Sequence, residues 1–273
     1  MSFTPVLPMS GYGGWAFLQR TLPAQKAAFE GSATVQRSED YFREKIGSIT
    51  TGAELVADRR LLEVALGAFG LDDDINNKYF IRKVLDSDLG DDSSLANRLS
   101  DDRYAAMAKA FGFGGTAATG EAGFADQILS RYVDKQFMIA VGDQDVTLRV
   151  AMNAQVDLPE LAASGGSENT MWYSVLGSEP LRELFQTAFG LPDSFASIDL
   201  DQQLSVLKER SRGLTGSTSP AAYADPEVFD KLLRRFLAMA QLQDGVSSTS
   251  PGATALSLLS GSGSASSILS IIV

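Results

Sequence analysis

The segment LLEVALGAFGL, from Leu61 to Leu71, decides the fold class of this 273-residue chain. Its apolar residues recur at every third or fourth position, which is the spacing of one face of an amphipathic helix. Gly70 follows this face and can adopt the left-handed conformation that ends many helices. Asp58, three residues before the segment, is typical of a helix N-cap. The segment therefore predicts a helix that packs on a core by one apolar stripe. That stripe consists of Leu61, Val64, Ala65, Ala68 and Phe69.

The same skeleton recurs 120 residues later as LRELFQTAFGL, from Leu181 to Leu191. Ser178 takes the place of the N-cap, and Gly190 takes the place of the terminating glycine. Further amphipathic patterns follow each copy, so we predict two related three-helix units over residues 51–113 and 171–240. The alternative is coincidence, because amphipathic helices that end at a glycine all look alike. The second stripe consists of Leu181, Leu184, Phe185, Ala188 and Phe189.

Two helical patterns lie between these copies and are expected to be the longest in the chain. ADQILSRYVDKQFMIAV ends before Gly142, and DQDVTLRVAMNAQVDLPELAA begins at Asp143, a residue suited to an N-cap. Joined by a tight turn, they predict a long antiparallel hairpin that packs the two units against each other. A further helix is expected over SEDYFREKIGSI, with Ser38 as its N-cap. No segment alternates with period two for long enough to predict a strand, so we expect an all-α helical bundle.

The two ends of the chain differ from the helical body, which we place at residues 15–244. Residues 1–14 are rich in Pro, Gly and Ser, which predicts a flexible lead-in ending at Trp15. Residues 245–273 contain no charged residue and are rich in Ser and Gly. This composition is typical of low-complexity segments that are disordered in isolation.

Composition excludes several classes of function. The 34 acidic and 23 basic residues give a net charge of -11, which repels nucleic acid and anionic membrane surfaces. The chain has no cysteine and no histidine. Without them, Ser-His-Asp and Cys-His catalytic arrangements cannot form, and zinc loses its usual ligands. We therefore expect no catalytic motif, no metal and no cofactor, and we expect the purified protein to carry neither transition metal nor nucleotide.

The sequence also predicts where the protein is made. The first twenty residues lack the basic start and the apolar core of a signal peptide, and no run of apolar residues is long enough to span a membrane. We expect synthesis in the cytoplasm, without a signal peptide and without membrane insertion. The absence of cysteine also fits a chain that is exported unfolded, because it cannot be trapped by wrong disulfides.

Two local patterns resemble binding sites but have simpler interpretations. The cluster from Gly112 to Thr116 resembles a phosphate-binding loop, yet it follows a helix and lacks the Gly-Lys-Ser/Thr ending. Pairs of acidic residues precede most of the expected helices, where carboxylates cap backbone N–H groups. A serine nucleophile activated by lysine stays open, because it needs only spatial proximity.

The residues most typical of binding are aromatic or aliphatic and lie near the two ends of the chain. Tyr12 and Trp15 are large rings in a glycine-rich setting, which is typical of docking segments. The uncharged tail carries two apolar islands, and we predict that it gains helical structure when it docks on a partner. Docking on its own body and a permanently loose tail are the alternatives. The candidate tail residues are Leu256, Leu258, Leu259, Ile268, Leu269, Ile271, Ile272 and Val273.

Several segments together resemble a known family. They include GWAFLQRT, YFREKI, ELVADRRLLEVALGAFGLDDDI, NKYFIRKVL and LANRLSDDRYAAMAKAFGFG, within residues 13–240. They are similar to an uncharacterised alphaproteobacterial family, a domain of unknown function whose members are often encoded in flagellar gene clusters. The resemblance implies a bacterial protein associated with the flagellum, and it brings no catalytic residues.

The leading interpretation is a non-enzymatic structural or interaction protein of the bacterial flagellum, exported through the flagellar secretion apparatus. Its partners would be flagellar components or a secretion chaperone. The first alternative is a cytoplasmic adaptor or chaperone-like regulator of flagellar assembly, which binds a flagellar subunit in a groove. The second alternative is a carboxylate-dependent hydrolase. An exposed apolar groove would favour the adaptor, whereas convergent carboxylates in a deep pocket would favour the hydrolase.

Overall fold

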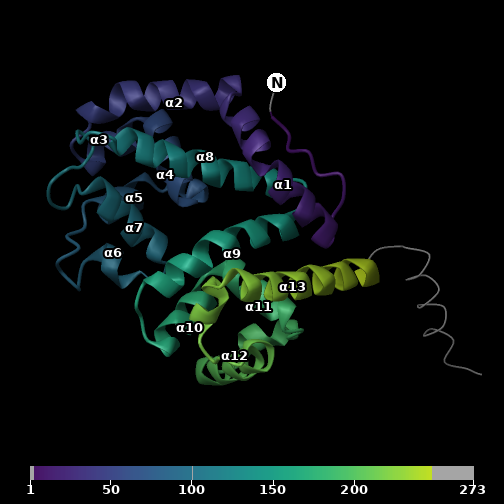
Figure 1. Ribbon diagram of the computed structural model, residues 1–273. Helices are drawn as coiled ribbons and strands as arrows, with labels where there is room; N and C mark the ends of the chain where they lie inside the picture. The colour runs from purple at the N-terminus through teal and green to yellow at the C-terminus, as the bar shows by residue number, and fades with distance from the viewer. Residues whose placement is uncertain (1–2, 100, 248–273) are drawn as a thin grey trace, which may run out of the picture.

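The computed structural model describes residues 3–99 and 101–247. Over these ranges the chain forms thirteen α-helices and four short 3-10 helices, and it forms no β-strand. This confirms the all-α prediction. Figure 1 shows two groups of helices, one around α4 and α8 and the other around α9, α11 and α13.

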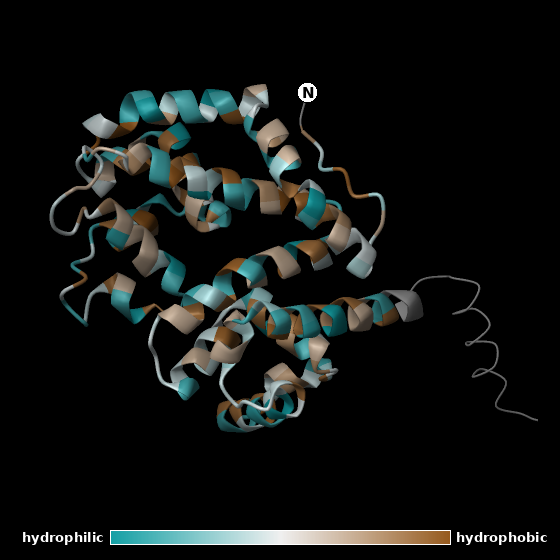
Figure 2. Ribbon diagram, in the orientation of Figure 1, coloured by the Kyte–Doolittle hydropathy of each residue, from teal (hydrophilic) through white to brown (hydrophobic). Residues whose placement is uncertain are grey.

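The first two helices are α1 (Gly11–Glu30) and α2 (Ala33–Lys45), and a 3-10 turn, η1 (Ile46–Ser48), follows them. The sequence placed the N-cap of the second helix at Ser38, but the cap is Ser32. The helix begins earlier because Val35 already packs its side chain in the core. Figure 2 shows α2 as mostly hydrophilic, as expected for a helix at the surface of the molecule.

The helix predicted from LLEVALGAFGL is α4 (Arg59–Phe69), and all five residues of its stripe are buried. Asp58 accepts hydrogen bonds from the backbone N–H groups of the first turn, as expected of an N-cap. At the other end Gly70 has φ of 66°, and Leu71 N donates to the carbonyl of Leu66. These features form a Schellman ending. The other elements of this unit are α3 (Gly52–Ala57), η2 (Asp72–Asn76), α5 (Lys78–Leu85), α6 (Leu95–Arg98) and α7 (Asp102–Phe111).

The second copy of the skeleton forms α11 (Glu179–Ala188), and its stripe is buried too. Gly190 has φ of 63°, and Leu191 N donates to the carbonyl of Gln186, so the Schellman ending recurs. Ser178 occupies the N-cap position, but its hydroxyl makes no capping hydrogen bond. The surrounding elements follow an order similar to that of the first unit, with a 3-10 helix in the place of α6. They are α10 (Glu168–Gly177), η3 (Asp193–Ser197), α12 (Leu200–Thr215), η4 (Pro220–Ala224) and α13 (Pro226–Ser247).

The hairpin between the units consists of α8 (Phe124–Gly142) and α9 (Val146–Ala163). The N-cap of α9 is Asp145, which accepts from Leu148 N, rather than Asp143 as expected. Asp143 is instead the C-cap of α8. The hairpin helices are 19 and 18 residues long, so the 20-residue α1 and the 22-residue α13 exceed them.

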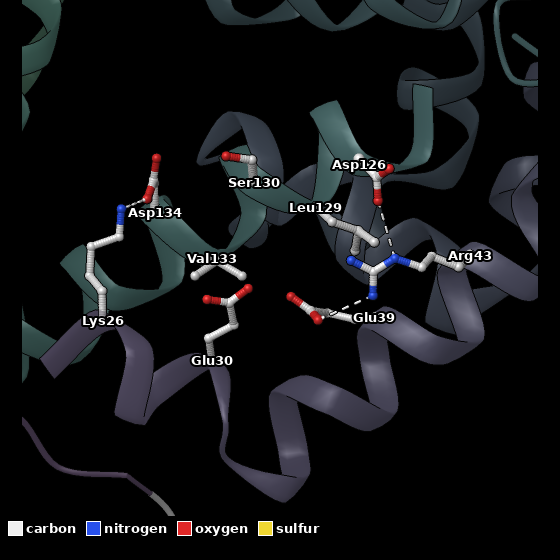
Figure 3. Close-up of a pocket in the computed structure, with 9 residues that line it drawn as sticks. All are labelled: Lys26, Glu30, Glu39, Arg43, Asp126, Leu129, Ser130, Val133 and Asp134. Carbon is white, nitrogen blue, oxygen red and sulfur yellow. Dashed lines mark hydrogen bonds and ion pairs between the residues drawn. The ribbon is translucent and has the colours of Figure 1, made fainter. Parts of the chain in front are cut away.

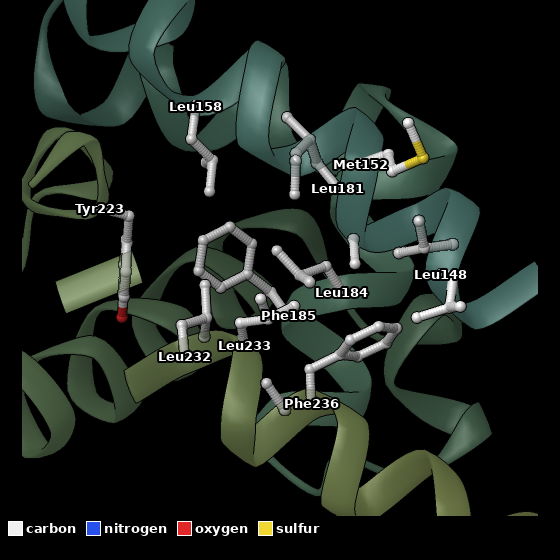
Figure 4. Packing of buried hydrophobic residues seen from close by; sticks show 14 of the residues in the cluster. Leu148, Met152, Leu158, Leu181, Leu184, Phe185, Tyr223, Leu232, Leu233 and Phe236 are labelled. Carbon is white, nitrogen blue, oxygen red and sulfur yellow. The ribbon is translucent and has the colours of Figure 1, made fainter. Parts of the chain in front are cut away.

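The buried residues form two cores, and α8 takes part in both. Its first half places Phe124, Ile128 and Leu129 in the core of α2 to α7. Its second half, from Val133 to Val141, joins the core of α1 and α9 to α13. Figure 4 shows the centre of the second core, where Phe185 lies among side chains from α9, α11 and α13. The hairpin therefore holds the two halves of the molecule together.

Candidate functional site

Trp15, expected as an exposed docking anchor, lies in the core. Its side chain is 6% exposed and belongs to the cluster formed by α1, the second half of α8 and α9 to α13. The cause is that α1 begins at Gly11 and continues through Trp15, so the ring faces inward with Leu18. Trp15 is therefore a packing residue, and a partner cannot contact it without displacing α1.

Tyr12 is half-buried and joins the start of α1 to α13. Its hydroxyl donates to Asp230 Oδ1 at 3.0 Å and accepts from Arg234 Nη2 at 2.6 Å. The Arg234 guanidinium also lies 4.1 Å from the centre of the Tyr12 ring. Burial, followed by the nearby Asp230 carboxylate, raises the pKa of the Tyr12 hydroxyl. Within the structure, Tyr12 is thus engaged in a contact between two helices.

The described part of the expected flexible lead-in is held against the body. Gln25 on α1 accepts from Val6 N at 2.7 Å and donates to Val6 O at 3.1 Å. Gln144 Nε2 donates to Pro5 O at 2.6 Å, and the Phe3 ring lies 5.5 Å from that of Phe29. Residues 3–10 are extended or bent rather than helical, but these contacts fix their course, and the helix starts four residues before Trp15.

An apolar groove lies between this N-terminal segment and α1. Its volume is about 330 Å³. Two polar side chains line it, Thr21 and Gln25, and both form hydrogen bonds within the protein. Thr21 donates to Phe17 O, and Gln25 bonds to the backbone of Val6. The groove therefore offers a ligand mainly apolar contact. Its lining residues are Phe3, Val6, Phe17, Thr21, Ala24, Gln25 and Ala28.

A second hollow, of about 160 Å³, lies where α1 and α2 meet α8, and its lining is charged. Figure 3 shows the side chains of Glu30 and Glu39 pointing into it from α1 and α2. Arg43 donates to Glu39 at 3.3 Å and to Asp126 at 3.2 Å. On the other side of the hollow Lys26 pairs with a carboxylate of α8. That pair is Lys26 with Asp134.

Glu39 is the buried member of this charged hollow, with 6% of its surface exposed. Burial raises the pKa of its carboxyl group, and the neighbouring Arg43 opposes that rise. A carboxyl group with a raised pKa can act as a general acid or base. Here, however, an arginine holds Glu39, which is the arrangement of a structural ion-pair network.

The residues of the glycine cluster have structural roles. Gly112 ends α7 with φ of 69°, and Gly114 lies against the backbone of Ser87, where any larger residue would collide. Ala118 N donates to Phe111 O and closes the loop. The acidic pairs behave similarly, because Asp101, Asp145 and Asp199 each accept backbone N–H groups at a helix start. These three caps belong to α7, α9 and α12.

The described ranges hold neither a metal-binding cluster nor a membrane-spanning helix. No cluster of three or more Asp or Glu residues there has the geometry to hold a metal ion. No helix among the same residues is long and apolar enough to cross a membrane. The eight candidate residues of the tail, from Leu256 to Val273, lie outside the described residues.

The sequence did not identify the apolar groove. Its lining comes from an N-terminal segment expected to be loose and from the outer face of α1, where alanines alternate with larger residues. The available signal was the run Phe3 to Met9, which holds four large apolar residues and two prolines. The contacts of Gln25, Gln144 and Phe29 with this run show where it lies.

The sequence profile of a family described as protein of unknown function (DUF1217) matches residues 68–244. Among solved structures, a crystallised protein from Agrobacterium tumefaciens is similar, with a TM-score of 0.71 and 28% sequence identity. The similarity covers 88% of this chain and 99% of the other. No curated protein matches the chain.

Proposed function

The chain belongs to the DUF1217 family of proteins of unknown function, and from its geometry we propose that it is a non-enzymatic protein that binds a partner through the apolar groove. The groove between α1 and residues 3–7 is the observation that carries this proposal. Its apolar lining and its internally satisfied polar groups suit an apolar side chain from a peptide or helix of another protein.

The outer surface of α1 supports this choice of site. Ala24 and Ala28 lie one turn apart on the face that lines the groove, and both are exposed. Small residues let a partner backbone approach closely, and the half-buried ring of Phe17 can pack against its side chains. Val6 is 60% exposed at the rim, so it offers a partner further apolar surface to cover.

The proposed partner is a component of the flagellum or a chaperone of its secretion apparatus. The resemblance of residues 13–240 to a family encoded among flagellar genes supports this proposal, as does the chain's freedom from cysteine. A folded body with a groove favours the adaptor form of the proposal, in which the protein binds a flagellar subunit in the cytoplasm. Export to the flagellum is the other form.

A carboxylate-dependent hydrolase receives less support from the charged hollow. The hollow is small, and Arg43 or Lys26 holds three of its four carboxylates in ion pairs. A general acid needs a carboxyl group that is free to exchange its proton with a substrate.

The proposal is tested by crosslinking inside the bacterium that encodes the protein. A photoreactive amino acid is placed at Ala28, in the groove, and the matched control places it at Ala27, which is exposed on the same helix but does not line the groove. We expect a crosslinked flagellar protein from position 28, identified by mass spectrometry, and none from position 27. Equal crosslinking at both positions would remove the groove from the proposal.

Cell fractionation separates the two forms of the flagellar proposal. The protein is followed in cells with and without an intact flagellar export apparatus. An exported component leaves the cytoplasm only when the apparatus is intact, whereas an adaptor stays in the cytoplasm in both. The flagellar association would be contradicted if the protein crosslinks to no flagellar component and has the same location with and without the export apparatus.

A further inference from the structure

The end of α13 lies near the start of α1. A side chain at Gly11 would collide with Gln241, so these two residues lie against each other, and Tyr12 hydrogen-bonds Asp230 of the same helix. Figure 1 shows α13 ending beside the first turn of α1. The chain beyond Ser247 therefore starts close to the helix that forms one wall of the groove.

The distance from this point to the groove follows from helix geometry. Ser247 is six residues beyond Gln241, and Thr21 is ten residues beyond Gly11. At a rise of 1.5 Å per residue, these stretches add up to about 24 Å. A Ser- and Gly-rich chain of the twenty residues from 248 to 267 has a root-mean-square span of about 22–27 Å. The next residues are the apolar island Ile268 to Val273.

The chemistry of this island matches that of the groove. No charged residue lines the groove, and residues 245–273 contain none. A segment without charged side chains enters an apolar groove without the cost of removing a side-chain ion from water. Its side chains also approach a chain with net charge -11 without electrostatic repulsion.

We propose that the chain's own segment Ile268 to Val273 occupies the groove between α1 and residues 3–7. The segment covers Val6, Phe17 and Ala28 in the free protein, and a flagellar partner must displace it. A linker whose average span equals the distance between two sites gives the highest effective concentration, which is on the millimolar scale. The inference rests on the proposed function only in that both use the same groove.

Cysteine crosslinking of the full chain tests this occupancy, and the absence of native cysteine makes each engineered pair unique. One variant combines Ala28→Cys with Ile271→Cys, and the control combines Ala27→Cys with Ile271→Cys. Both alanines are exposed, so neither change disturbs the core. Under mild oxidation of dilute protein we expect the Ala28 pair to form an intramolecular disulfide roughly tenfold faster than the control. Adding Ile268→Asp should slow the Ala28 pair to the control rate.

Each remaining outcome overturns the inference. Equal rates for the two pairs would mean that the segment has no fixed position, and no disulfide would mean that it does not reach the groove. A disulfide-linked dimer that depends on protein concentration would show that the segment docks on a second copy. The photocrosslink from position 28 to a partner is measured in a separate experiment. If that photocrosslink is absent and the intramolecular disulfide still forms rapidly, the proposed function is rejected and this inference stands.

Discussion

Gln25 and Val6 exchange two hydrogen bonds, so one side chain on α1 fixes the backbone of the N-terminal segment. The two contacts, at 2.7 and 3.1 Å, imitate the pairing of neighbouring strands. Gln25 is buried, with 8% of its surface exposed, and also donates to Thr21 Oγ1 at 2.8 Å. This amide, together with the contacts of Gln144 with Pro5 and of Phe29 with Phe3, holds the segment beside the helix and so forms the groove.

Replacing Gln25 by Leu should release the segment. The backbone groups of Val6 would lose both partners and bond to water instead, and the net contribution of one such hydrogen bond to stability is about 0.5–1.5 kcal/mol. We expect a lower free energy of unfolding in urea and faster hydrogen exchange at Val6. Gln19→Leu is the matched control, since Gln19 bonds only to Gln155 at the surface. A variant as stable as the control would show that the clamp contributes nothing.

Replacing the terminating glycine should lower the free energy of unfolding by a similar amount in the two units. Gly70 and Gly190 have φ of 66° and 63°, a region where a Cβ atom costs about 1–2 kcal/mol. We expect Gly70→Ala and Gly190→Ala each to lower the free energy of unfolding by about that amount. Gly47→Ala should have little effect, because nothing lies near its Cβ position and it has no positive φ. Unequal losses at the two glycines would weaken the prediction of related units.

Local signals explain how much of the fold could be predicted. Asp58 caps α4 and Gly70 ends it, as expected, because these residues act on the backbone beside them. The order of elements is also similar in residues 51–113 and 171–240, although the short α-helix α6 of the first unit corresponds to the 3-10 helix η4 of the second. That the units arose by duplication stays a prediction, which superposition of α3 to α7 on α10 to α13 would test.

The candidate site could not be predicted in the same way. Trp15 in a glycine-rich sequence is typical of an exposed anchor, but its burial depends on α8, α9 and α13, more than a hundred residues away. Gln25 carries no local signal for its bond to Val6, nineteen residues earlier. Long-range packing therefore decided the role of both residues.

The phenylalanine at the end of each stripe should carry a large share of stability. Phe69 and Phe189 are 5% and 3% exposed. Replacement of either by Ala should lower the free energy of unfolding by about 3–5 kcal/mol, the range for a buried aromatic residue. Tyr79→Ala is the control, since Tyr79 is 70% exposed. Losses below about 1 kcal/mol, measured by urea denaturation, would indicate that the stripes are loosely packed.

Removing the Tyr12 hydroxyl group should weaken the contact between Tyr12 and α13 and lower the free energy of unfolding. Tyr12→Phe removes the bonds to Asp230 and Arg234 and keeps the ring beneath the guanidinium. We expect a loss of about 1 kcal/mol, and a larger loss for Tyr12→Ala, which also removes the ring contact. Tyr173→Phe, at an exposed tyrosine bonded to Asp201, is the control. Equal values for Tyr12→Phe and Tyr12→Ala would assign the whole effect to the hydroxyl.

Glu39 and Glu54 should give stability changes of opposite sign with pH. Burial raises the pKa of Glu39 above 4.5, so ionisation costs the folded state free energy at neutral pH. Glu39→Gln imitates the neutral form, and we expect the variant to be at least as stable as the native protein at pH 7, with the difference vanishing below pH 4.5.

The Thr50 and Thr51 N–H groups lower the pKa of Glu54, so ionised Glu54 stabilises the fold. Glu54→Gln should therefore be less stable at pH 7, and its deficit should disappear as the pH falls through the lowered pKa. Urea denaturation at pH 7 and at a pH well below 4.5 measures both, and a strongly destabilised Glu39→Gln at pH 7 would show that its pairing with Arg43 outweighs burial.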